Sequence, residues 1–235
     1  MMTQTIREGP PRPEITELEV RRATVADLPG IMEVERDWPE GQRAPQAKFE
    51  ARLERFAEGV FVALVGAEVV GVTTSCLTHY ADDKLGAFAA WDAVTNDGWI
   101  NDRSEISDPN GVYVVSTGIK QAFRGLSIFP QLIAAQIALS KQLQLRYCVT
   151  GAILEGYAEY CRAHGPTDAR VYALLMGEQG TYIDPLLRKL QRVGFCIPDE
   201  RHILAEYFAS EDAHDWSVLM VVDHSSSAAR NPADA

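Results

Sequence analysis

Residues Val112 to Leu132 read VYVVSTGIKQAFRGLSIFPQL, and they hold the densest structural signal in the chain. The apolar, β-branched run at the start predicts a strand, and the apolar run at the end predicts a long helix. Arg124 and Gly125 stand in the short turn between them. A strand that turns directly into a helix presents unpaired backbone N–H groups together with the positive end of the helix dipole. The segment therefore predicts an anion site, most often one for phosphate.

The turn resembles the acyl-CoA-binding segment of the GNAT acetyltransferase superfamily, which opens its helix with R/Q-x-x-G-x-G/A. Arg124 fills the first position, whereas Ser127 and Phe129 replace the two small residues. A strand, turn and helix without any ligand is the alternative, because short glycine motifs are weak signals on their own. The resemblance implies that the pyrophosphate of acetyl-CoA or another acyl-CoA is held by the backbone of Arg124, Gly125, Leu126, Ser127, Ile128 and Phe129.

The bulk of Phe129 leads to an expectation about the first turn of this helix. Pro130 suits an early helical position, because its missing N–H is one of the groups that stay unpaired there. We therefore expect a normal helix start, with Phe129 pointing inward beside Leu132 and Ile133.

The flanking segments follow the GNAT order of strand, two helices, hairpin, strand, long helix and strand. Thr24 is a good N-cap, and Asp27 stands at the acidic position of a capping box, so a helix is predicted to begin there. The other matching pieces are a helix with Phe49, Leu53 and Phe56 on one face, strands at 60–65 and 69–74, and a helix at 184–195 that runs into Gly194-Phe195.

The resemblance predicts one α/β domain with a GNAT-like fold. Its sheet is expected to be mixed, mostly antiparallel and flanked by helices, with a V-shaped split between the fourth and fifth strands at residues 112–119 and 147–153. The domain is expected over residues 17–223, with insertions at 79–110 and 154–183. Residues 1–16 and 224–235 are expected to be disordered tails because of their composition.

Both insertions are longer than ordinary connections in a compact domain, which favours a function or a structure of their own. The first contains Tyr80, Phe88, Trp91 and Trp99, and the second contains four tyrosines. Two interpretations stay open for these side chains: the wall of an acyl or acceptor pocket, or a small satellite core. Apolar walls would favour acyl chains longer than acetyl. The second insertion also resembles that of a GNAT subgroup sometimes fused to carbon–nitrogen hydrolases.

In the GNAT reaction an amine attacks an acyl thioester that lies in the V. The resemblance implies that backbone groups of Thr117 and Ile119 face the CoA arm and that one amide polarises the thioester carbonyl. Gly118 between them would let chain and ligand approach closely. A strand end with a bulge is the plainer interpretation of these residues.

The residues for proton transfer are less clear from the sequence. Leu190 stands where many GNAT enzymes have a general-acid tyrosine, although CoA thiolate can also leave without a protein acid. Tyr157 is the named candidate for that acid, and Tyr160 and Tyr182 are open alternatives. A structural hydrogen bond is the simpler role for each phenol. The candidate general base is His79, at the end of the third strand, with Glu155 as the other possibility.

Composition excludes several classes of function. The formal net charge is −11, and no basic stripe for nucleic acid is present. A negative surface suits a cationic substrate, although solubility alone explains it. No apolar run is long enough for a membrane span, and no signal-peptide pattern is present, so a cytoplasmic protein is expected. The histidines and the four cysteines lack metal-ligand spacing, so no metal site is expected and the thiols are expected to be buried.

Two hypotheses from different classes follow. The first is an acyl-CoA-dependent N-acyltransferase, most simply an acetyltransferase, that acts on a small amine or amino compound by direct transfer. The second is a non-catalytic acyl-CoA-binding or degenerate GNAT-like module for sensing or interaction. The expected partner is a small-molecule acceptor, without nucleic acid or membrane, and a homodimer stays open.

Overall fold

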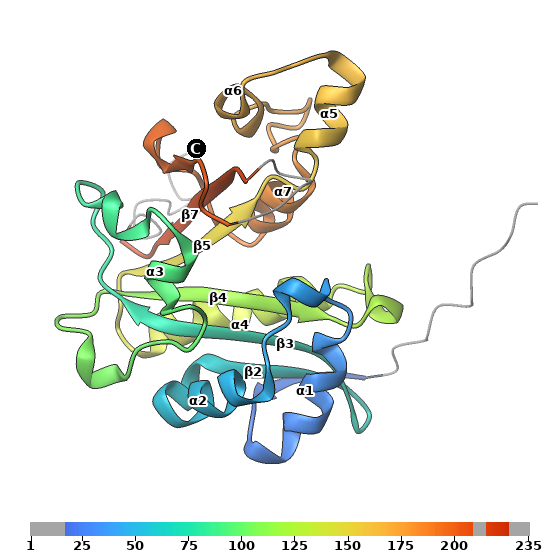
Figure 1. Ribbon diagram of the computed structural model, residues 1–235, viewed down its shortest axis with the longest axis vertical. Helices are drawn as coiled ribbons and strands as arrows, with labels where there is room; N and C mark the ends of the chain where they lie inside the picture. Colours follow the sequence, from blue (N-terminus) through green and yellow to red (C-terminus); the bar gives the residue numbers. More distant parts are fainter. Residues whose placement is uncertain (1–16, 209–214, 226–235) are drawn as a thin grey trace, which may run out of the picture.

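The computed structural model describes residues 17–208 and 215–225. Its centre is a seven-stranded sheet in the order β1-β2-β3-β4-β5-β7-β6 (Figure 1). Neighbouring strands are antiparallel except β4 and β5, which are parallel. The strands are β1 (Leu18–Arg22), β2 (Val60–Val65), β3 (Glu68–Thr78), β4 (Gly111–Ile119), β5 (Tyr147–Ile153), β6 (Ile203–Leu204) and β7 (Ser217–Asp223).

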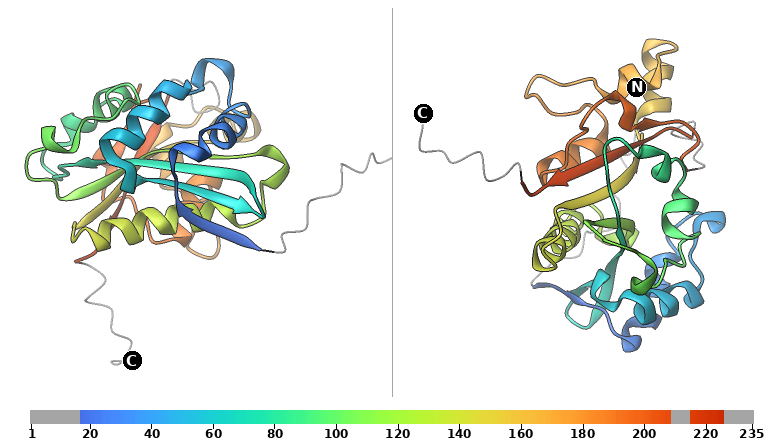
Figure 2. Two further views of the ribbon diagram at one scale, coloured as in Figure 1. Left: turned by 90° about the horizontal axis from the view of Figure 1, so that it is seen from below. Right: turned by 90° about the vertical axis from the view of Figure 1, so that its left-hand side faces the viewer.

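Helices cover both faces of this sheet. In Figure 2, left, α1 and α2 lie on one side of the sheet and α4 lies on the other. We call the side of α1 and α2 the front face, and the side of α4 and α7 the rear face. The helices are α1 (Leu28–Glu35), α2 (Gln46–Phe56), α3 (Trp91–Thr95), α4 (Ile128–Gln142), α5 (Tyr157–His164), α6 (Ala169–Ala173) and α7 (Pro185–Arg192).

Local sequence explains how the first helical segment starts. Asp27 accepts hydrogen bonds from the backbone N–H and the hydroxyl of Thr24, at 2.8 and 3.0 Å, and completes the capping box. A short 3-10 turn lies between this cap and α1, which has Pro29 in its first turn. In α2, Phe49 and Phe56 are buried toward the sheet, as the periodicity predicts.

The expected split of the sheet is present. Residues 111–114 of β4 pair with residues 147–150 of β5, and the pairing ends at Val114 and Thr150. Beyond that point β4 continues along β3, while β5 continues along β7. A register shift opposite Thr74 and Ser75 leaves Val115 as a bulge. We call the gap the V and its closed end, at Val114 and Thr150, the vertex. The mixed, mostly antiparallel fold is confirmed.

The first insertion forms the satellite core that was one of its two interpretations. Tyr80 and Phe88 are 1% exposed and pack in the cluster that contains Tyr113 and Val115 of β4. Trp91 is only partly buried, and its indole N–H donates to the carbonyl oxygen of Val115 at 3.0 Å. The aromatics of this insertion therefore build the front face beside the vertex.

The second insertion forms α5 and α6, which lie beyond β5 and β7 in Figure 1. Three of its tyrosines pack together, with ring centroids of Tyr157 and Tyr160 at 5.3 and 5.1 Å from that of Tyr172. Tyr182 is buried in the same rear cluster as Leu187 of α7. None of the described helices is long and apolar enough to cross a bilayer.

One expectation needs correction. Cys76 and Cys148 are buried, but Cys161 is only half-buried and Cys196 is exposed, so the thiols are not buried as a set. Cys196 follows the end of α7 in a segment that faces solvent on one side. The expected tails at 1–16 and 226–235 lie outside the described residues. His224 is placed, because its ring accepts or donates a hydrogen bond at 2.8 Å with Ser140 of α4.

Candidate active site

The free edge of β4 provides a backbone surface inside the V. The backbone N–H of Lys120 donates to Val70 of β3 at 2.9 Å, and hydrogen-bonding residues alternate along an antiparallel strand. The N–H and C=O groups of Thr117 and Ile119 therefore point away from β3, toward the V. Ser116 and Thr117 are partly exposed, which agrees with an open gap at this level. Thr117 thus presents its N–H and C=O to the V, where the Ile119 carbonyl also accepts a long hydrogen bond from Arg124 Nε.

Gly118 lies against protein on the front face, in addition to the role that the sequence suggested. A Cβ added there would lie 2.9 Å from the indole nitrogen of Trp38 and 3.1 Å from Val34. The space next to Gly118 is thus taken by the end of α1 on the front face. Its lack of a side chain lets protein, as well as any ligand in the V, approach the strand.

The turn after β4 opens α4 with two left-handed residues. Gly125 has φ of 83° and Ser127 has φ of 60°, and α4 begins at Ile128. Ser127 is the N-cap, but its side chain makes no capping hydrogen bond. The left-handed backbone gives a physical reason for the small residue that GNAT proteins prefer there. Arg124 is exposed, and its Nε lies 3.4 Å from the carbonyl oxygen of Ile119.

The first turn of α4 matches most of the sequence expectation. Pro130 lies in that turn, exposed, where its missing N–H leaves no intrahelical bond broken. Phe129 is half-buried and packs against the rear cluster that contains Ile133. Leu132, expected beside it, belongs to another cluster, with Ile128 and Phe123.

A buried cation that sequence reasoning missed lies on the front face next to the V. Arg52 of α2 is 1% exposed, and burial lowers its pKa to about 10. Its Nε donates to the carbonyl of Gly98 at 2.8 Å, and its Nη1 lies 3.2 Å from Thr74 Oγ1 and 3.5 Å from Ser116 Oγ. Glu35 interacts with this charge and is itself buried, which raises its pKa. The sequence of α2 indicated this buried charge, because Arg52 falls on the apolar face of the helix.

A pair of phenols was also missed. Tyr113 of β4 and Tyr207, which follows β6, are hydrogen-bonded through their hydroxyl groups. The backbone N–H of Gly151 donates to the Tyr113 hydroxyl at 3.2 Å. Gly151 is the first residue of β5 past the vertex, so the phenols lie where the two strands part. Burial raises the pKa of both tyrosines.

The two predicted catalytic side chains are not brought to this point. His79 is exposed beyond the paired end of β3, and its Nδ1 lies 2.8 Å from the carbonyl oxygen of Asp108. Tyr157 donates to the carbonyl oxygen of Thr167 at 2.6 Å, inside the second insertion. The roles given to them stay predictions. Leu190 is buried in the rear cluster and offers no polar group.

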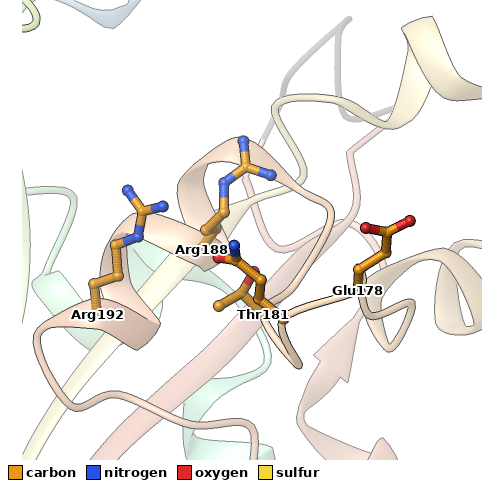
Figure 3. A pocket seen from close by; sticks show the side chains of 5 residues that line it. Glu178, Thr181, Arg188 and Arg192 are labelled. Atoms are coloured by element: carbon orange, nitrogen blue, oxygen red, sulfur yellow. The ribbon is translucent and has the colours of Figure 1, made fainter.

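Two open hollows lie beside the second insertion, away from the V. One has a volume of about 480 Å³ and is lined by the polar side chains shown in Figure 3, including Arg188 and Arg192 of α7. The other, of about 510 Å³, is lined by residues 168–175, in and beside α6, and by Glu200. Within residues 17–208 and 215–225, no group of three or more His, Cys, Asp and Glu side chains could hold a metal ion.

The sequence comparisons are sparse. No family model matches the chain. A curated relative, the probable hydrolase YhcX of Bacillus subtilis strain 168, is 24% identical over 179 residues. The match covers 76% of this chain and 33% of that protein, so this chain spans about a third of the relative's length.

The structural comparisons are stronger. The loading GNATL domain of CurA from Lyngbya majuscula has a TM-score of 0.73 at 17% identity, over 88% of this chain and 98% of that one. The GNAT-like decarboxylase GphF, in complex with isobutyryl-CoA, has 0.70 at 21% identity, over 87% and 98%. The structure of yncA from Salmonella typhimurium with its cofactor acetyl-CoA has 0.54 at 13% identity, over 88% and 93%. Together with the V and the turn into α4, these likenesses show that the chain has the fold of the GNAT superfamily.

Proposed function

We propose that the protein binds an acyl-CoA along the free edge of β4 and transfers the acyl group to a small amine. The observation that carries the proposal is the free edge of β4 at Thr117 and Ile119, followed along the chain by the left-handed turn at Gly125 and Ser127 that opens α4. An extended arm can pair with Thr117 and Ile119, and an anion can accept from the amides of the turn. Arg124 beside the turn adds a positive charge.

The neighbours support a CoA ligand. Two of the structures that share this fold contain isobutyryl-CoA or acetyl-CoA. A pyrophosphate at the start of α4 needs only main-chain donors, so the changes at Ser127 and Phe129 leave the required groups in place. The Phe129 ring packs against the rear cluster.

The proposed chemistry is direct transfer. The V would hold the thioester against β4, with the acyl carbon facing the front face, and an amine would attack from that side. Glu35 lies on the front face close to Arg52, and burial raises the pKa of its carboxyl group. It is a candidate general base. The formal net charge of −11 favours a cationic amine over an anionic acceptor. The residues proposed from the sequence are His79 as general base and Tyr157 as the acid for the leaving thiolate.

Acyl-CoA binding without transfer is the second candidate function. It is favoured by one observation: Leu190 stands in place of the family's acid and is buried among apolar side chains. A sensor would keep the turn and the β4 edge but would not need a proton-transfer group.

Calorimetric titration with acetyl-CoA tests the shared part of both candidates. We expect saturable binding to wild-type protein and at least a tenfold weaker affinity for Arg124→Glu, because the substitution places a like charge beside the pyrophosphate. Arg162→Glu is the matched control, since Arg162 is also exposed but lies on α5. Equal affinities of the wild type and Arg124→Glu would place the CoA elsewhere.

Release of free CoA thiol from acetyl-CoA, measured with a panel of small amines, then separates the two candidates. Transfer predicts that at least one amine raises the rate above that of hydrolysis, with formation of the matching amide. A protein that binds acetyl-CoA but consumes it with none of the amines is the non-catalytic module.

A further inference from the structure

The phenol pair at the vertex has one more hydroxyl proton than its observed hydrogen bonds use. Tyr113 and Tyr207 together carry two O–H donors, and their mutual bond uses one of them. Gly151 supplies another donor to Tyr113, not an acceptor. Among the described residues, no acceptor for the second hydroxyl proton is present, whichever phenol carries it. A buried donor without an acceptor costs roughly 1–3 kcal/mol, so this geometry favours an incoming acceptor.

The route to that proton leads through the V. The phenols themselves are 0% and 3% exposed. Gly151, whose backbone N–H bonds to the Tyr113 hydroxyl, is partly exposed, as is Ser116 of β4. A Cβ at Gly151 would lie 2.4 Å from Tyr207 Cε1, so only glycine leaves room for the ring at this point. A group that enters the V as far as Gly151 therefore reaches the backbone amide that donates to the Tyr113 hydroxyl.

The environment of the phenols decides between two kinds of chemistry. Burial is the largest cause that raises the pKa of both tyrosines, so they stay neutral at physiological pH. A thiol has an ordinary pKa of about 8.5, so its thiolate is a weaker base than the phenolates of these tyrosines. Proton transfer from such a phenol to a departing thiolate would be uphill. Donation of a hydrogen bond to an oxygen that gains negative charge needs no such transfer.

We propose that the Tyr113–Tyr207 pair donates a hydrogen bond to the carbonyl oxygen of the acyl thioester at the vertex. The inference rests on the proposed acyl-CoA binding in the V. The acceptor's nitrogen bonds to the carbonyl carbon, and the carbonyl electron pair moves onto the oxygen that the phenol contacts. The electron pair on oxygen then re-forms the C=O bond as the C–S bond breaks. The C–S pair leaves with sulfur as the thiolate, and the proton of the attacking amine goes to solvent. The phenol keeps its proton throughout.

Binding measurements alone can test whether the thioester carbonyl oxygen accepts this hydrogen bond. Calorimetry compares acetyl-CoA with S-ethyl-CoA, a thioether of the same size that lacks the carbonyl oxygen. We expect wild-type protein to bind acetyl-CoA more tightly. In the double variant Tyr113→Phe/Tyr207→Phe, the Kd of S-ethyl-CoA divided by the Kd of acetyl-CoA should fall about fivefold. This factor corresponds to the loss of one net hydrogen bond. The affinity for S-ethyl-CoA should not change.

Tyr80→Phe is the matched control, because it removes a phenol of the same aromatic cluster that bonds to His202 instead. It should leave the ratio unchanged. An unchanged ratio in the double variant overturns the phenol donor, even when both ligands bind. If neither ligand binds the wild type, the proposed function itself fails.

A misfolded double variant would leave two independent tests. The single variants Tyr113→Phe and Tyr207→Phe each remove one hydroxyl group. The phenol that donates to the thioester carbonyl is the one whose loss lowers the ratio of the S-ethyl-CoA Kd to the acetyl-CoA Kd. The wild type is informative without any substitution, because equal affinities for acetyl-CoA and S-ethyl-CoA would overturn the proposal.

Discussion

Substitution of Gly151 by alanine should disrupt the vertex. The new Cβ would lie 2.4 Å from Tyr207 Cε1, 3.0 Å from Tyr207 Cζ and 2.9 Å from the Tyr113 hydroxyl. The Tyr207 ring is 3% exposed and cannot move outward without breaking its bond to Tyr113. Overpacking of this kind costs about 1–3 kcal/mol, and we expect about 2 kcal/mol because both tyrosines are involved. At two to four degrees per kcal/mol, the melting temperature should fall by roughly 4–8 °C.

A double-mutant cycle identifies the cause of this loss. Urea denaturation should be measured for Gly151→Ala in the wild-type background and in Tyr207→Leu, which removes the two clashing ring atoms. We expect a cost below about 0.5 kcal/mol in the second background, and therefore a coupling energy above 1 kcal/mol. Gly86→Ala is the matched control, since its Cβ would meet nothing within 4 Å. The same cost in both backgrounds would refute the assigned contact.

Three further substitutions test other parts of the structure. Ser127→Gly should stabilise the protein by up to about 1 kcal/mol in thermal unfolding, because glycine adopts the left-handed backbone without strain and the serine side chain makes no capping bond. The affinity for acetyl-CoA should stay unchanged. A loss of stability would contradict this. Asp184→Ala should cost roughly 2–4 kcal/mol in urea denaturation, and Asp184→Asn about half as much, because the 1% exposed carboxylate accepts from Leu186, Leu187, Gly156 and Tyr172; equal costs would show that charge is the whole effect. The Arg21 guanidinium lowers the pKa of Asp27 to about 2, so its stabilisation is complete above the usual Asp pKa and is lost as the pH falls toward 2. Asp27→Asn should therefore remove a part of the stability loss between pH 4 and 2, and an unchanged slope would exclude Asp27 as its source.

Local signals carried most of the fold. The capping box at Thr24 and Asp27 involves residues three apart in the chain, and the face of α2 follows a helical period, so both could be predicted from the sequence. The split between β4 and β5 followed from the order of elements in a known superfamily. The left-handed backbone of Ser127 was not predicted, because serine adopts that conformation only where the surrounding turn requires it.

The candidate site depended on contacts between distant segments. Tyr207 meets Tyr113 across 94 positions, and nothing near Tyr207 in the sequence marks that partner. The burial of Arg52 could be predicted, because it lies three residues after Phe49 on the apolar face of α2. Its partners Gly98 and Ser116 could not, because they come from other segments. Tyr157 was selected from its place in an insertion, whereas its hydroxyl bonds within that insertion.

A crystal structure of the protein with acetyl-CoA tests the central claim most directly. We predict that the pyrophosphate accepts hydrogen bonds from the backbone amides between Gly125 and Phe129, and that the CoA arm runs along Thr117 and Ile119 with its thioester at the vertex. A pyrophosphate bound elsewhere, for example by Arg188 and Arg192 in the hollow of Figure 3, with an empty V, would contradict the account.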